Sequence, residues 1–220
     1  MREYHPEIST AHERATQDDP WIMYLIVRKD WAGSREELLT MAARAAVQAE
    51  AQLLEQEREA FDAWWAQSFR KVVLRADEKQ WEQAASEIPS VINGAVIACA
   101  PLLRSQRPKL LTKLQALQDL PLEVASQSAC HFGLNFYVLK DISLGKQMAQ
   151  IAHAAMKLAV QQQVPFNRVA LMPMRVLYVD DPSLIVSTVD PEKLTVINDA
   201  GLTEVESGTL TTAAVFVDVE

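Results

Sequence analysis

The chain has 220 residues, of which 49% are hydrophobic and 23% charged, so it is long enough for one large or two small domains with a buried core. This composition excludes a disordered tail and a disulfide-stabilised miniprotein. The 29 acidic residues against 21 lysines and arginines give a net charge of -8, so a nucleic-acid site has to be a local basic patch.

The first twenty residues mix charges, His and Pro and contain no apolar run of the kind that a signal peptide or a membrane helix requires. We interpret residues 1–20 as a mobile N-terminal arm. Elsewhere the apolar stretches are much shorter than the ~20 residues that cross a bilayer. The two cysteines, Cys99 and Cys130, lie outside any metal-binding or disulfide spacing, which favours a reducing compartment. We therefore expect a cytoplasmic protein with no membrane partner.

The first predicted elements form a strand, a helix and two more strands. The strand YLIVRKD ends at Lys29-Asp30, and the helix that follows carries a run of small residues at 42–46. The segment FRKVVLRADE at 69–78 predicts a second strand, and residues 94–97 predict a third.

The same order returns later in the chain. The strand NFYVLKD ends at Lys140-Asp141, a helix with small residues at 151–155 follows, and MRVLYVDDPS at 174–183 and residues 213–216 predict two further strands. This agreement predicts an internal repeat. The second series carries an extra segment, NDAGLTEVESGTLTT, before its last strand.

Alternating strands and helices favour an α/β fold. We expect two copies of a small mixed sheet flanked by helices, packed as a pseudo-dimer within the chain. The predicted boundaries are 21–124 for the first copy, 125–133 for a polar linker and 134–220 for the second copy.

The predicted helix after Ser143 has one apolar stripe and one polar stripe at helical spacing. The polar stripe consists of Lys146, Gln150, His153 and Lys157, with Lys146 in the first turn, where a helix favours an anion. The alternative interpretation is an ordinary solvated face. The aligned positions of the first copy are Glu37, Met41 and Arg44, so a site on this stripe would exist once.

The extra segment has glycines suited to turns, which places Asp199, Thr203 and Thr211 at strand ends or turns. An ordinary hairpin, in which Asp199 caps a turn, is the alternative.

Two groups of short motifs occur in the second copy, and their members are Lys140-Asp141, Gly145-Lys146, Ala149-Gln150, Ala152-His153-Ala154, Asp199-Ala200-Gly201-Leu202-Thr203-Glu204 and Gly208-Thr209-Leu210-Thr211. In order and spacing they resemble the archaeal and eukaryotic type of peptidyl-tRNA hydrolase over residues 134–220. The first copy repeats only the order of strands and helix, so we interpret it as a degenerate copy. The sequence departs from the family pattern at Leu202 and Glu204.

The resemblance implies hydrolysis of the ester that joins a peptide to tRNA, which recycles tRNA for translation. It implies catalytic roles for Lys146, Asp199, Thr203 and Thr211, and substrate contacts by Lys140, Gln150, His153 and Thr209. No metal or cofactor is implied. Ester hydrolysis needs an oriented water and a stabilised oxyanion, which carboxylate, ammonium and hydroxyl groups can supply.

Peptidyl-tRNA is therefore the expected partner, with a homo-oligomer as a further possibility beyond the intrachain pseudo-dimer. The alternative is an inactive RNA-binding or protein-interaction module of the same fold. Lys146, Asp199 and Thr203 favour the enzyme, whereas Leu202, Glu204 and the acidic net charge favour the module.

Overall fold

The computed structural model describes residues 20–125, 127–200 and 204–217. The predicted arm at 1–20 therefore lies, except for Pro20, outside the described residues. The elements are, in chain order, β1 (Trp21–Arg28), α1 (Arg35–Leu53), α2 (Arg58–Gln67), β2 (Arg70–Ala76), α3 (Glu78–Glu87), β3 (Ser90–Asn93), β4 (Val96–Cys99), β5 (Leu102–Leu103), the 3-10 helix η2 (Arg104–Gln106), α4 (Lys109–Lys113), β6 (Gln115–Ala116), β7 (Gly133–Leu139), α5 (Leu144–Gln161), α6 (Phe166–Leu171), β8 (Met174–Val179), α7 (Ser183–Val186), η3 (Pro191–Lys193), β9 (Leu194–Asn198) and β10 (Leu210–Val217).

The strands form two mixed sheets, which confirms the predicted α/β class. The first sheet has the order β3-β4-β1-β2-β6, with β5 also pairing with β1, and the second has the order β8-β7-β10-β9. In each sheet the first two long strands are parallel, β1 with β2 and β7 with β8. The closing hairpins, β3–β4 and β9–β10, are antiparallel. The two sheets thus share the order and the directions of four strands.

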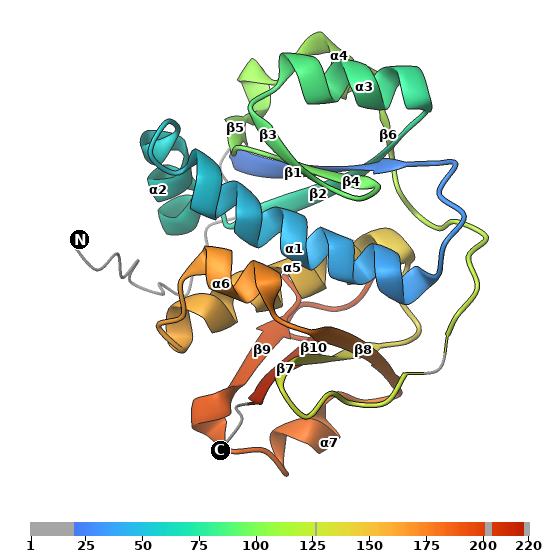
Figure 1. Cartoon of the computed structure of the whole chain (residues 1–220), viewed down its shortest axis with the longest axis vertical. Helices are drawn as coiled ribbons and strands as arrows, with labels where there is room; N and C mark the ends of the chain where they lie inside the picture. Colours follow the sequence, from blue (N-terminus) through green and yellow to red (C-terminus); the bar gives the residue numbers. More distant parts are fainter. Residues whose placement is uncertain (1–19, 126, 201–203, 218–220) are drawn as a thin grey trace.

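The sheets face each other across a layer of helices that contains α1 and α5 (Figure 1). Helices α3 and α4 cover the outer face of the first sheet, and α7 lies beyond the second (Figure 1). The central core contains residues of both sheets and of both long helices. The two halves of the chain therefore share this central cluster, and each half also has a smaller cluster of its own.

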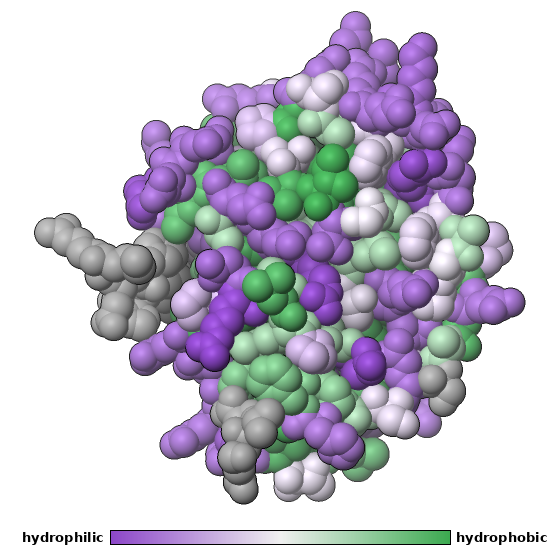
Figure 2. All heavy atoms as spheres, viewed as in Figure 1, coloured by the Kyte–Doolittle hydropathy of each residue, from purple (hydrophilic) through white to green (hydrophobic). Residues whose placement is uncertain are grey.

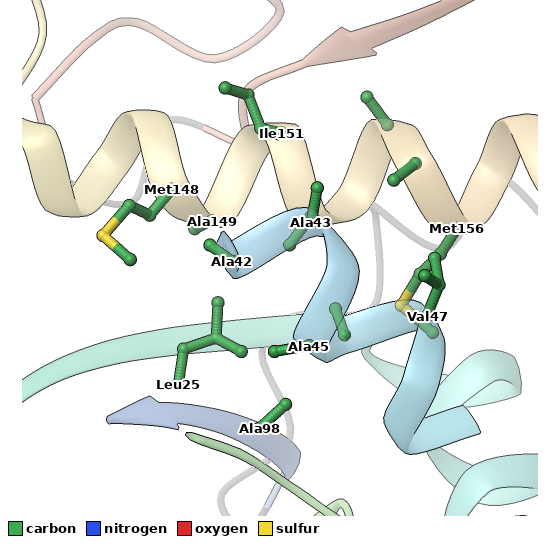
Figure 3. Packing of buried hydrophobic residues seen from close by; sticks show 14 of the residues in the cluster. Leu25, Ala42, Ala43, Ala45, Val47, Ala98, Met148, Ala149, Ile151 and Met156 are labelled. Carbon is green, nitrogen blue, oxygen red and sulfur yellow. The ribbon is translucent and has the colours of Figure 1, made fainter. Parts of the chain in front are cut away.

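Small side chains allow α1 and α5 to approach closely. Ala42 and Ala43 of α1 are fully buried and lie against the α5 segment that carries Met148, Ala149 and Ile151 (Figure 3). The alanine runs seen in the sequence are thus a packing feature of a helix buried on most sides. Hydrophilic side chains cover much of the outer surface in the view of Figure 2.

Four short strands and one boundary differ from the predictions. β3, β5, β6 and β9, of two to five residues, were not predicted, because runs of this length carry little periodicity. The strand predicted at 94–97 begins at Val96, and Gly94 instead forms the turn after β3 with a φ of +56°. Glycine suits this turn because it adopts positive φ without strain.

Candidate active site

A cavity of about 210 Å³ lies between the two halves of the chain. The N-terminal half lines it with the start of β2 and with residues 116–118, which lie just after β6 begins. The C-terminal half lines it with one face of α5, with residues 198–200 at the end of β9, and with Glu204. Ligands of drug size occupy about 300–1,000 Å³, so this cavity accommodates only the reacting end of a large substrate.

Three polar side chains meet at this cavity. Lys146 on the first turn of α5 forms an ion pair with Asp199 Oδ2, and their side chains are only 12% and 3% exposed. Gln150, one turn further along α5, donates from Nε2 to the same oxygen at 2.7 Å. The structure thus brings together a cation, a carboxylate and an amide from segments about fifty residues apart in sequence.

The orientation of the Gln150 amide follows from its partner. An ionised carboxylate only accepts hydrogen bonds, so the atom that faces Asp199 has to be the NH₂ group. The amide oxygen therefore points elsewhere, and it is buried with no hydrogen-bond partner among the described residues. A buried acceptor of this kind at a cavity suits a water molecule or a substrate donor.

The start of α5 is occupied by protein groups. The N–H of Leu144 donates to Asp119 Oδ1 at 3.2 Å, that of Gly145 donates to the Gln118 carbonyl at 3.2 Å, and that of Lys146 donates to Ser143 Oγ at 3.3 Å. Two of these N–H groups therefore bind the N-terminal half of the chain, one of them at the Asp119 carboxylate, and the third binds the Ser143 cap. The anion that the start of this helix favours is thus supplied by the chain itself.

Glycine is required at position 145 because the backbone of residues 117–118 passes close to it. A Cβ atom at this position would lie 2.0 Å from the carbonyl oxygen of Leu117, which is a backbone atom and not a flexible side chain. The Gly-Lys motif thus combines a close backbone approach with the cation that follows it.

The polar stripe of α5 is not a solvated face, because its side chains meet groups of both halves of the chain, namely Asp199 and the Val196 carbonyl on one side and the Phe69 carbonyl on the other. His153 Nε2 lies 2.7 Å from the carbonyl oxygen of Phe69, so this nitrogen carries the hydrogen. Phe69 has a φ of +46°, a conformation that residues other than glycine rarely adopt. Its ring stacks on that of Trp65, with 4.1 Å between the two ring centres. The strained residue just before β2 therefore forms a wall of the cavity.

Two further ionisable groups are buried beside this wall. The Lys71 ammonium position lies 4.5 Å from the Trp64 ring centre and has no hydrogen-bond partner within the described part of the chain. Burial lowers the pKa of Lys71 well below its usual value, although the nearby Glu50 carboxyl opposes the shift. Burial also raises the pKa of Glu50 to about 8, against a hydrogen bond from Trp65.

The raised pKa of Glu50 predicts a pH-dependent cost to stability. Between its ordinary value of 4.5 and about 8, the folded chain holds a proton that the unfolded chain has lost, so this group lowers the free energy of unfolding as pH rises through that window. Glu50→Gln removes the effect. In denaturant titrations, the free energy of unfolding of this variant minus that of the original chain should increase by about 1–3 kcal/mol from pH 5 to pH 8. The exposed Glu55→Gln is the control, and equal pH profiles for all three proteins would contradict the assignment.

The comparisons with known proteins bear on one half of the chain. Residues 21–91 match the family Peptidyl-tRNA hydrolase PTH2. The comparison with curated proteins found no match, and neither did the comparison with solved structures. The matched range runs from β1 to the start of β3, so the N-terminal half carries a PTH2 signature of its own. The motif comparison had assigned that half only a shared order of elements.

The other residues singled out by the motifs lie in different places. Lys140 pairs with the exposed Asp180 and does not line the cavity. Thr211 is fully buried and donates to the Ile197 carbonyl at 3.1 Å. The Thr209 carbonyl accepts from the Asp199 N–H at 2.8 Å, so its backbone supports the carboxylate. Thr203 lies outside the described residues.

Sequence reasoning missed the contribution of the N-terminal half to this cavity. Phe69, Arg70 and Lys71 line it, together with Leu117 and Gln118. The charged pair Arg70-Lys71 at the start of an apolar strand was the available signal, because a strand that enters a core rarely buries a lysine.

No group of three or more potential metal-binding side chains occurs within residues 20–125, 127–200 and 204–217. Among the helices of the described ranges, none is both long and apolar enough to cross a membrane.

Proposed function

We propose that the chain hydrolyses the ester bond of peptidyl-tRNA at the cavity beside Lys146, Asp199 and Gln150. The observation that carries this proposal is the convergence of the Lys146 ammonium and the Gln150 amide on one oxygen of Asp199. The PTH2 match over residues 21–91 and the motif resemblance over residues 134–220 support the same activity from different parts of the chain.

The proposed chemistry uses each of the three groups. Asp199 accepts a hydrogen bond from one water molecule, and so does the Gln150 amide oxygen, which has no partner within the part of the chain that the structure describes. Together they orient this water toward the ester carbonyl. The ammonium of Lys146, which pairs with Asp199, supplies the positive charge that stabilises the oxyanion formed when water adds. Collapse of this intermediate breaks the bond between the carbonyl carbon and the ribose oxygen, and the proton given up by the water protonates that oxygen, so the products are the peptide acid and the free hydroxyl of the terminal ribose.

In this proposal Thr209, Thr211 and His153 hold in place the segments that surround the reacting groups. Thr211 fixes the strand end two residues before Asp199 through the Ile197 carbonyl, and Thr209 fixes Asp199 itself. His153 holds the Phe69 wall in place. Arg70, which is half-buried at the cavity, is the residue of the N-terminal half that we expect to contact an RNA phosphate. We retain Lys140 and Thr203 as proposed substrate-contacting and catalytic residues.

The proposal also treats the N-terminal half, 21–124, as a duplicated copy that has become scaffold for the catalytic copy at 134–220, packed against it as a pseudo-dimer. The equal strand order of the two sheets supports this view. Ser34 and Ser143 cap α1 and α5, and Glu37 and Lys146 occupy the third position of each helix. Met41, at the position of Gln150, packs against the Gly94 turn where the second half has Asp199.

The direct test incubates the full chain with an N-acetylated aminoacyl-tRNA and follows the release of free tRNA. We expect multiple turnovers with kcat on the order of 1–10 per second. Acid-precipitable ester that persists through long incubation would contradict the proposal, and retained tRNA binding in that case would identify the inactive RNA-binding module instead.

A further inference from the structure

The two long helices begin with the same cap but complete it differently. In α1, Ser34 Oγ accepts from the Glu37 N–H at 3.2 Å, and Glu37 Oε2 accepts from the Ser34 N–H at 2.9 Å. This is a reciprocal capping box, which needs an acceptor at the third helical position. In α5 that position is Lys146, and an ammonium group only donates hydrogen bonds, so it cannot accept from the Ser143 N–H.

Glu204 supplies the missing acceptor from a distant part of the chain. Its Oε2 accepts from the Ser143 N–H at 2.7 Å, and its Oε1 accepts from the Ser143 hydroxyl. The same hydroxyl oxygen accepts from the Lys146 N–H at 3.3 Å. One carboxylate therefore performs at α5 the task that Glu37 performs at α1.

The position of Glu204 in the chain gives this contact a consequence for the site. Glu204 follows Asp199 by five residues, and both lie in the connection between β9 and β10. At the base of this connection, Asp199 exchanges backbone hydrogen bonds with Thr209 and Gly208 at 2.8 and 2.7 Å. The Ser143 contact ties the segment that carries Asp199 to the first turn of α5, which carries Lys146.

We infer that Glu204 is a positioning residue, which completes the cap of α5 from outside the helix and so holds Lys146 and Asp199 in register. Moving the acceptor to Glu204 frees the third position of α5 for a cation. A cap formed within the helix, as in α1, would leave a carboxylate at that position. The catalytic consequence rests on the proposed hydrolysis, whereas the capping role does not.

Steady-state kinetics tests the catalytic consequence and hydrogen exchange tests the capping role of Glu204, both on the full chain. Glu204→Ala should lower kcat about 10- to 100-fold with KM changed less than about threefold, because a small misplacement of reacting groups costs this much without removing a substrate contact. Glu204→Gln retains one acceptor for the Ser143 N–H and should recover most of the loss. Amide exchange over residues 143–146 should accelerate at least about tenfold in Glu204→Ala.

The matched control is Glu37→Ala, which removes the equivalent acceptor from α1. We expect it to accelerate amide exchange at the start of α1 and to leave kcat and exchange at 143–146 unchanged. Unchanged exchange at 143–146 in Glu204→Ala would overturn the capping role whether or not the chain hydrolyses the ester. An unchanged or higher kcat would show that Glu204 is not a positioning residue, and an increase confined to KM would show that it contacts substrate instead. Absence of hydrolysis in the unsubstituted chain would refute the proposed function and leave the exchange result to decide the cap.

Discussion

Asp199→Asn is expected to lower kcat for tRNA release at least about 100-fold, the scale associated with loss of a general base or of a water-orienting carboxylate. The substitution keeps the shape of the side chain but replaces one acceptor oxygen with an NH₂ group. Lys146 and Gln150 both direct donors at Asp199 Oδ2, so the Asn oxygen can take that place, but the amide lacks the negative charge and the second acceptor oxygen that orient the water in the proposed reaction. The measurement is the steady-state rate with N-acetylated aminoacyl-tRNA.

The control for this substitution is Asp30→Asn. Asp30 also pairs with a basic side chain, that of Arg28, but its side chain is 50% exposed and lies outside the cavity. Rates equal to that of the original chain for both variants, with melting temperatures within a few degrees, would show that Asp199 is not part of the reacting centre.

Lys146→Met is expected to lower kcat about 100- to 1,000-fold, because it removes the cation that pairs with Asp199. Methionine preserves most of the aliphatic stem, so the loss reports the ammonium and not the packing. Lys146→Arg should give an intermediate rate, since guanidinium keeps the charge but changes its geometry.

A measurement of stability distinguishes the expected loss of kcat in Lys146→Met from a loss caused by misfolding. The exposed Lys29→Met is the matched control, with an unchanged rate. Lys146→Met also leaves Asp199 buried without its cation, which should cost about 1–3 kcal/mol in denaturant titrations. A variant that unfolds at the original denaturant midpoint and retains the original rate would contradict both roles of Lys146.

Local patterns were sufficient to predict the main elements. The three- and four-residue spacing of Lys146, Gln150 and His153 predicted one polar face on α5, and the structure places these residues on the side facing the cavity or the Phe69 wall. The Lys-Asp pairs after the first strand of each half lie at equivalent ends of β1 and β7, and the N–H groups of Lys29 and Lys140 bind the ends of β2 and β8.

Contacts between the halves were not predictable from those patterns. The capping contact joins Ser143 to a carboxylate 61 residues away, and no periodicity connects them. The close approach of Leu117 to Gly145 depends on how a segment without long helices or strands crosses the start of α5. The burial of Lys71 against Trp64 likewise follows from tertiary packing. Sequence spacing reports which residues share an element, and long-range packing decides what those residues meet.

The most direct test of the central claim is the kcat of the double variant Lys146→Met/Asp199→Asn, measured on the full chain beside both single variants. If the ammonium and the carboxylate act as one reacting centre, the double variant should be within about threefold of the slower single variant, because removal of either group already disables the other. Losses that multiply, or a double variant as fast as the original chain, would contradict a shared centre at this cavity.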